Sequence, residues 1–213
     1  MKLDKILNSN FYNQFENKLL DELSSIGILK KAEPDKILVE IRREINFIPI
    51  IISGIVKVKR RDGKGNGIFI HFLGENQTSA ITLTYALENQ ISEIRLEAMT
   101  KVTYISIPAK IVNTWFHKYE SWRAYYLQLN QQQTSRLIET INNLAFTSLD
   151  ERIVKYLKHI IEYTKIKTIK IKHFDIARDL KVTREAISRT LKKLETQGVV
   201  KLYRNKIDYL GQL

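Results

Sequence analysis

The side chains best suited to chemistry lie on one predicted helix near the C-terminal end of the chain. Thr183 is a favourable N-cap, Gly198 is a typical helix-ending residue, and the pattern between them predicts a helix over residues 184–197. Its apolar residues would face inward and leave a polar, basic outer face. That face holds Arg184, Glu185, Ser188, Arg189, Lys192 and Lys193. Because arginine can donate two hydrogen bonds to guanine and glutamate can accept one from cytosine, such a face could read base edges in DNA.

A second helix and a hairpin would position this face. The sequence predicts a short helix over Phe174–Leu180 with Phe174 on its inner side, and a tight turn at Lys181–Val182. Two strands would follow, Val199–Tyr203 and Ile207–Leu210, around a basic tip that includes Arg204 and Lys206. Helix, turn, helix and basic hairpin together indicate a winged helix-turn-helix. The predicted DNA-binding residues are Thr183, Arg184, Glu185, Ser188, Arg189, Lys192, Arg204 and Lys206.

The charge distribution favours a polyanionic partner for this end of the chain. The 213 residues include 35 Lys and Arg against 23 Asp and Glu, a formal net charge of +12. Residues 147–213 carry 16 basic and 8 acidic side chains, whereas residues 1–146 carry 19 and 15. A small basic unit on a nearly neutral body is typical of nucleic-acid binding. The alternative is a basic surface that only keeps the protein in solution.

The first half of the chain predicts short helices followed by an antiparallel sheet structure. Residues 1–30 carry apolar side chains at helical spacing, and several short strands with turns between them follow. A turn is expected at 62–65, where glycines supply positive φ. The expected strands are Ile37–Ile41, Ile48–Ser53, Ile55–Lys59, Ile68–Phe72, Ile91–Leu96 and Val102–Ile107. This spacing indicates an antiparallel barrel or sandwich.

A long helix is predicted between the two parts. Residues 109–146 contain neither proline nor glycine, so one continuous helix could cover them. Such a helix is longer than a small domain needs and would serve as a spacer or as a dimer interface. Its richness in aromatic residues favours the interface. The predicted dimerisation residues are Trp115, Trp122, Tyr126, Leu129 and Leu137.

Three segments resemble the Crp/Fnr superfamily of bacterial transcription regulators. Val182–Arg189 is similar to the recognition helix of that superfamily, and Ser53–Val58 and Phe72–Glu75 are similar to its β-roll. The resemblance implies an α+β fold: a jelly-roll-like antiparallel β-roll with N-terminal helices (1–108), a long dimerisation helix and hinge (109–147), and a winged helix-turn-helix (148–213). It also implies a homodimer on a palindromic double-stranded DNA operator, with RNA polymerase as a further partner.

The effector is left unknown by the sequence. The cyclic-nucleotide binders of this superfamily carry a Gly-Glu pair and an Arg-Ser pair in the β-roll, and neither pair is present in Gln77–Thr82 or Gln90–Glu93. We therefore expect no dependence on cyclic AMP. Arg95, the nearest arginine, is expected on the surface of a strand. Zero cysteines exclude a thiolate-held iron–sulfur cluster, and the four histidines form no recognisable ligand pair, so no metal or other cofactor is predicted.

Other function classes have less support. The chain has no phosphate-binding P-loop, no HExxH and no GxSxG motif, so it is not predicted to be an enzyme. Two alternatives stay open: the β-roll could bind a small molecule while the basic C-terminal domain binds RNA or a protein partner. The N-terminal segment lacks the apolar core of a signal peptide, and no apolar stretch reaches the length of a membrane span. A cytoplasmic protein is therefore expected.

Overall fold

The computed structural model describes residues 3–61 and 67–211; for residues 61, 67, 136 and 139–146 only the backbone is described. The chain divides into two compact units, Met1–Leu137 and Ile138–Leu213, and each is treated by itself. The turn expected at 62–65 lies outside the described residues. Every helix in the described ranges is too short or too polar to cross a lipid bilayer.

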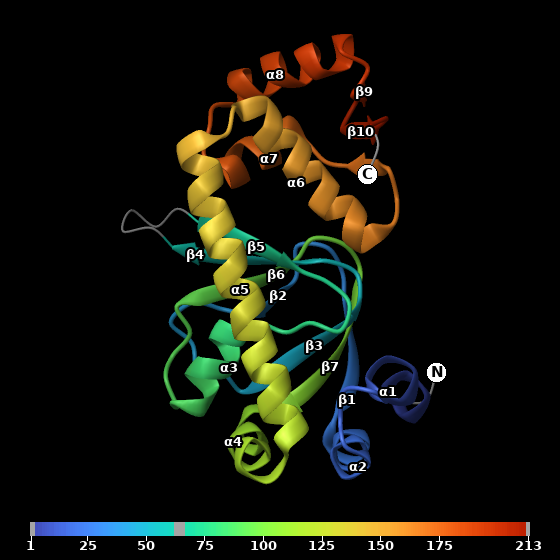
Figure 1. Cartoon of the computed structure of the whole chain (residues 1–213), viewed down its shortest axis with the longest axis vertical. Coiled ribbons are helices and arrows are strands. Elements are labelled where there is room, and N and C mark those ends of the chain that lie inside the picture. Colours follow the sequence, from blue (N-terminus) through green and yellow to red (C-terminus); the bar gives the residue numbers. More distant parts are fainter. Residues whose placement is uncertain (1–2, 62–66, 212–213) are drawn as a thin grey trace. The chain divides into compact units, whose positions relative to one another are not determined.

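Unit 1 combines helices with two antiparallel sheets (Figure 1). One sheet has the strand order β1-β7-β3 and the other β2-β6-β4-β5. Its elements are α1 (Leu3–Phe11), α2 (Asn17–Ile26), β1 (Ile28–Ala32), β2 (Ile37–Val39), β3 (Phe47–Ser53), β4 (Val56–Arg61), β5 (Gly67–Leu73), α3 (Ala80–Leu87), β6 (Ile94–Ala98), β7 (Val102–Pro108), α4 (Ala109–Lys118) and the first part of α5 (Glu120–Phe146). The predicted α+β fold with an antiparallel N-terminal sheet region is confirmed.

Strand β3 contributes side chains to two separate hydrophobic cores. Ile48 and Ile50 pack into the core formed with the N-terminal helices, α4 and α5, whereas Ile51 packs into the core of the β2-β6-β4-β5 sheet. A strand buried on both faces needs a nearly continuous apolar run, which is what β3 has.

In β4 the expected alternation of apolar and basic residues is present, but Lys57 and Lys59 are buried as well. Lys59 is neutralised there by Glu97, 2.6 Å away.

The single long helix expected from Ala109 to Phe146 is wrong, because the chain bends at Tyr119. Tyr119 has extended backbone angles (φ −116°, ψ 121°) between the end of α4 and the start of α5. The Glu16 carboxylate accepts a hydrogen bond from the Ser121 amide (3.0 Å), which satisfies one free amide at the start of α5. The Tyr119 hydroxyl donates to Glu22 on α2 (2.7 Å). These partners lie about a hundred residues earlier in the chain, so no proline or glycine is needed to break the helix.

Most of the predicted dimerisation residues belong to the core of their own unit. Trp115, Trp122 and Leu129 are buried against α1, α2 and the β1-β7-β3 sheet, so the single chain does not leave them exposed for a partner. The rings of Phe11 and Phe15 fill the space beside the tryptophans. Tyr126 is partly buried and its hydroxyl lies 2.9 Å from that of Thr84 on α3. Leu137 alone of the five is exposed (46%).

The opposite face of α5 is apolar and uncovered in the single chain. Leu127, Leu137 and Ile138 are exposed by 63%, 46% and 56%. Leu127 and Leu137 are ten residues apart, the a-to-d spacing of a heptad pattern, and the exposed Thr134 lies between them on the same side. We call Leu127, Thr134, Leu137 and Ile138 the outer stripe of α5.

Unit 2 contains three helices and a small antiparallel sheet of order β8-β10-β9. Its helices and strands are the end of α5, then α6 (Leu149–Thr164), β8 (Thr168–Lys170), α7 (His173–Leu180), α8 (Arg184–Thr196), β9 (Val200–Tyr203) and β10 (Lys206–Tyr209). Figure 1 shows β9 and β10 following α8 at the C-terminal end of the chain. This is the order of a winged helix-turn-helix.

Candidate nucleic-acid interface

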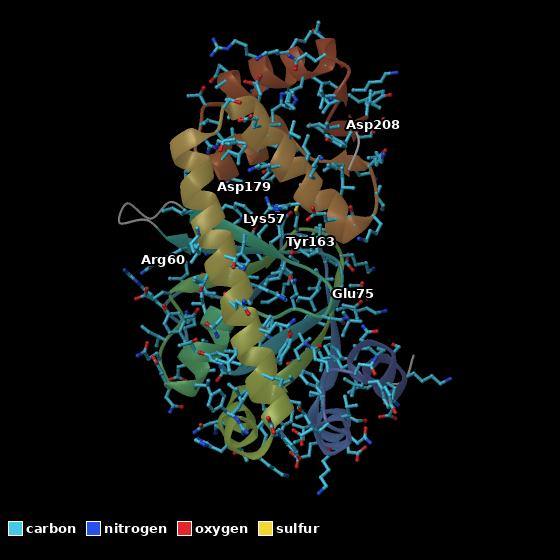
Figure 2. The ribbon with its side chains drawn as sticks, in the orientation of Figure 1. Lys57, Arg60, Glu75, Tyr163, Asp179 and Asp208 are labelled. Carbon is cyan, nitrogen blue, oxygen red and sulfur yellow. The ribbon has the colours of Figure 1, made fainter. Side chains whose placement is uncertain are left out.

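Helix α6 forms the support on which the two shorter helices rest. Ser148 and Glu151 begin α6 with a reciprocal capping box. From its buried side, the Tyr156 hydroxyl donates to the Asp179 carboxylate of α7 (2.7 Å; Asp179 is labelled in Figure 2). Burial and the neighbouring Asp179 raise the pKa of Tyr156 well above its ordinary value, so the hydroxyl stays a donor. Arg152 donates to the Leu180 carbonyl (2.7 Å), which fixes the end of α7.

The turn between α7 and α8 is short and has well-defined local chemistry. Lys181 ends α7 in the left-handed conformation (φ 56°), and the Val182 amide donates back to the Ala177 carbonyl (3.1 Å). The Thr183 hydroxyl then accepts from the Ala186 amide (3.1 Å), as predicted for the N-cap of α8. Together these contacts set the direction in which α8 leaves the turn.

Helix α8 separates an apolar face from a charged one. Of the predicted inward residues, Ile187, Thr190, Leu191 and Leu194 are buried and Ala186 is half-buried, which confirms the assignment of that face. The predicted base-reading residues Arg184, Glu185 and Arg189 are exposed within the first two turns. Lys192 is exposed one turn further on, and Lys193 forms an ion pair with Asp150 of α6. The first two turns therefore present donors and acceptors free of the core.

The wing adds a second basic surface. Asn205 takes a positive φ (56°) at the tip between β9 and β10, beside the exposed Arg204. The Lys206 ammonium lies over the Tyr203 ring, 4.1 Å from its centroid. A hollow of about 430 Å³ lies next to the tip. It is lined by Lys170, Ile171, Lys172, Asp175, Arg204, Asn205 and Lys206, so its walls carry four cationic side chains.

The local sequence pattern missed two features of this surface. Phe174 is 59% exposed rather than on the inner side of α7, with the Arg178 guanidinium 5.9 Å from its ring centroid, so the predicted inner position is wrong. Ile176 and Ala177 fill the inner face without it. The second feature is a contact between helices: the Nδ1 atom of His173 lies 2.9 Å from the Ser188 hydroxyl oxygen. A lone histidine fifteen residues upstream gives no sequence signal for such a pair.

Comparison with known proteins agrees with this geometry. Residues 151–210 match the family model described as a Crp-like helix-turn-helix domain. No curated protein matches the sequence.

Solved structures resemble the whole chain. A protein from Eubacterium rectale described as a Crp/Fnr-family transcriptional regulator is 22% identical, with a TM-score of 0.77 over 94% of this chain and 93% of that one. The c-di-GMP-responsive global regulator CLP of Xanthomonas campestris is 15% identical, with a TM-score of 0.74 over 92% and 100%. FixK2 of Bradyrhizobium japonicum is 13% identical, with a TM-score of 0.72 over 87% and 93%. Residues 151–210 thus match a Crp-like helix-turn-helix domain, and the chain as a whole has the same fold as these three structures.

Proposed function

We propose that this protein is a homodimeric, sequence-specific DNA-binding transcription regulator. The observation that carries the proposal is the exposed set Arg184, Glu185 and Arg189 in the first two turns of α8, held by a short turn and a capped helix start. A helix presented in this way can enter the major groove with its amino end against base edges. Selection of bound duplexes from a random DNA pool tests the proposal; an enriched palindromic sequence is the expected result, and no enrichment would refute it.

The predicted DNA-binding residues would divide into two roles. Arg184, Glu185, Ser188 and Arg189 lie where base edges would pass, whereas Lys192 and the wing residues Arg204 and Lys206 would contact phosphates. Phosphate contacts supply affinity that falls with salt, and base contacts supply sequence preference. The basic hollow at the wing tip supports the phosphate role, because a polyanion would neutralise its cationic walls.

Dimerisation would use the outer stripe of α5. An exposed apolar stripe with heptad spacing is stabilised when a second helix covers it, and a two-fold dimer is the commonest way to do so. A two-fold dimer would place two copies of α8 on a palindromic operator, and RNA polymerase is the partner through which such a complex would act on transcription.

Arg189 provides a direct test of base reading. Replacing Arg189 with Ala should weaken operator binding by about 1–3 kcal/mol and relax the preference at one base pair in each half-site. Arg189→Lys keeps the charge but loses the two-pronged donor geometry, so it should keep the salt dependence and still lose the preference. Gel-shift titration at two salt concentrations and selection from the random pool measure both quantities. Equal affinity and unchanged preference in Arg189→Ala would contradict the assignment.

Cyclic nucleotides are not proposed as effectors. Arg95 donates two hydrogen bonds to Glu40 (3.0 and 2.9 Å), so its guanidinium already has a carboxylate partner. The Ser79 hydroxyl caps α3, and the Ser92 hydroxyl bonds to the backbone of Ile94. No arginine stands between Gln77 and Glu93 in the sequence. A buried cyclic phosphate needs a cation and several donors. The buried Thr78 and Thr82 hydroxyls have no partner and could donate, but residues 77–93 contain neither arginine nor lysine.

Calorimetric titration with cyclic AMP and cyclic GMP should therefore give no saturable heat at micromolar ligand. Operator binding should occur without added nucleotide, as measured by gel shift with and without either nucleotide at roughly 100 μM, a concentration that would saturate a micromolar site. DNA binding that strictly requires a cyclic nucleotide would overturn this part of the proposal.

A further inference from the structure

The contact between His173 and Ser188 joins the start of α7 to the base-facing side of α8. His173 is the first residue of α7 and Ser188 lies in the second turn of α8. Their Nδ1 and Oγ atoms are 2.9 Å apart, and both residues are half-buried. The neighbours of Ser188 along this face, Arg184, Glu185 and Arg189, are exposed. The Ser188 hydroxyl is thus held on its inner side while its outer side faces the surface proposed to meet DNA.

Several helix hydroxyls in the described ranges donate to a backbone carbonyl of their own helix. Thr84, Thr164 and Thr196 each donate to the carbonyl four residues earlier, at 2.9, 2.9 and 3.1 Å. The contact of Ser188 is with a side chain of another helix, as are those of Ser24 with Asp4 and of Thr84 with Tyr126. The Ser188 hydroxyl is therefore engaged by His173.

We propose that His173 is a positioning residue for sequence recognition: it fixes the hydrogen-bonding role that the Ser188 hydroxyl offers to a base. This inference rests on the proposed function in DNA binding. A serine hydroxyl has one donor and two acceptor sites, so a freely rotating serine accepts many bases. When the imidazole nitrogen takes one of these hydrogen-bonding sites, only the other sites of the Ser188 hydroxyl are left for a base in the groove. Without His173, the Ser188 hydroxyl would rotate freely and the base preference at its position would relax.

The electrostatic surroundings of the ring favour its neutral form. Burial, and then the nearby Arg184 guanidinium, lower the pKa of His173 below its ordinary value. The ring is therefore mainly neutral at pH 7, and a neutral imidazole nitrogen either donates or accepts but does not do both. The hydrogen bond to Ser188 needs no charge on the ring.

The test compares substitutions that place a polar atom at different positions. The shorter side chain of the His173→Asn variant would put an amide atom where Nδ1 lies, whereas His173→Gln would put it nearer the position of Nε2. His173→Leu removes both polar atoms while keeping a similar bulk. Each variant, together with Ser188→Ala and wild type, is carried through selection from a random duplex pool, with thermal unfolding measured in parallel.

The expected result is positional. His173→Leu and Ser188→Ala should lose preference at the same base pair, by about threefold to tenfold, the worth of one hydrogen bond. His173→Asn should restore the preference and His173→Gln should not. The salt dependence of binding should stay unchanged in all of them, because the phosphate contacts remain.

Three outcomes would overturn the inference while leaving DNA binding in place. The first is a wild-type base preference in His173→Leu, and the second is a change at a base pair that Ser188→Ala does not affect. The third is equal behaviour of the Asn and Gln variants, which would indicate that His173 only supports the fold. A wild-type protein that enriches no sequence would instead refute the proposed function, and this inference with it.

Discussion

Replacing Leu127 and Leu137 together with glutamate should convert the protein into folded monomers and weaken operator binding by about 10²–10⁴-fold. Both side chains are exposed in the single chain, so the substitutions remove no core contact. Two glutamates on a heptad stripe would face two more across a two-fold interface, where like charges repel. Each monomer would then bind one half-site, and the gain from linking two half-sites would be lost. Sedimentation velocity and gel shift measure the two effects.

A matched control on the same helix separates charge from position. Gln128→Glu with Ser135→Glu adds the same two charges at exposed positions of α5 that lie away from the outer stripe. This control should stay dimeric and bind the operator with an affinity close to that of wild type. Dimers that persist after substitution of Leu127 and Leu137, at the protein concentrations of the control, would contradict the proposed interface.

The winged domain is predictable from sequence because its signals are local. Thr183 as N-cap, the turn after Leu180 and the apolar spacing in 187–194 each act within a few residues, and the structure has all three. The same spacing predicts the charged face of α8, because the residues outside the apolar positions are mostly charged. What the sequence could not predict there is the pairing of His173 with Ser188, because it depends on how two helices meet.

The sequence alone does not show which side of α5 faces the core, and the reason is physical. Helix α5 carries apolar residues on two sides, and composition favours the aromatic side as the interface. Which side faces inward is decided by Phe15, Glu16 and Glu22, which lie about a hundred residues earlier in the chain. Composition alone ranks Trp122 above Leu127 as an interface residue, since aromatic residues are enriched at interfaces and in cores alike.

Two elements of unit 1 give no clear signal in the sequence either. Strand β1 is mostly exposed and contains Lys30 and Lys31, so its sequence has no clear apolar alternation. It is a strand because it pairs with β7. Helix α3 is short and contains the β-branched residues Ile81, Thr82 and Thr84, and its strongest local sign is the Ser79 cap. Both elements depend on tertiary contacts for their conformation.

Trp122→Ala should destabilise unit 1 by about 3–5 kcal/mol, the usual loss for removing a fully buried tryptophan. The Trp122 ring lies 5.7 Å from Phe15, 5.3 Å from Trp115 and 5.6 Å from Tyr125 between ring centroids, so alanine would leave a cavity bordered by three aromatic rings. The chain has two tryptophans, so the fluorescence of Trp115 in the variant reports on unit 1 alone during urea unfolding.

The same measurement decides between a core and an interface role for this side of α5. Leu127→Ala, on the outer stripe, is made in a Leu137→Glu background that sedimentation velocity has shown to be monomeric. It should change the free energy of unfolding there by less than about 0.5 kcal/mol, because an exposed side chain contributes little to a monomer. Trp122→Ala in that background should keep its full cost, since the ring is buried by its own chain. If Trp122→Ala were nearly neutral in the monomeric background and costly only in the dimer, the tryptophan would lie at the subunit interface, and the outer stripe would lose its role.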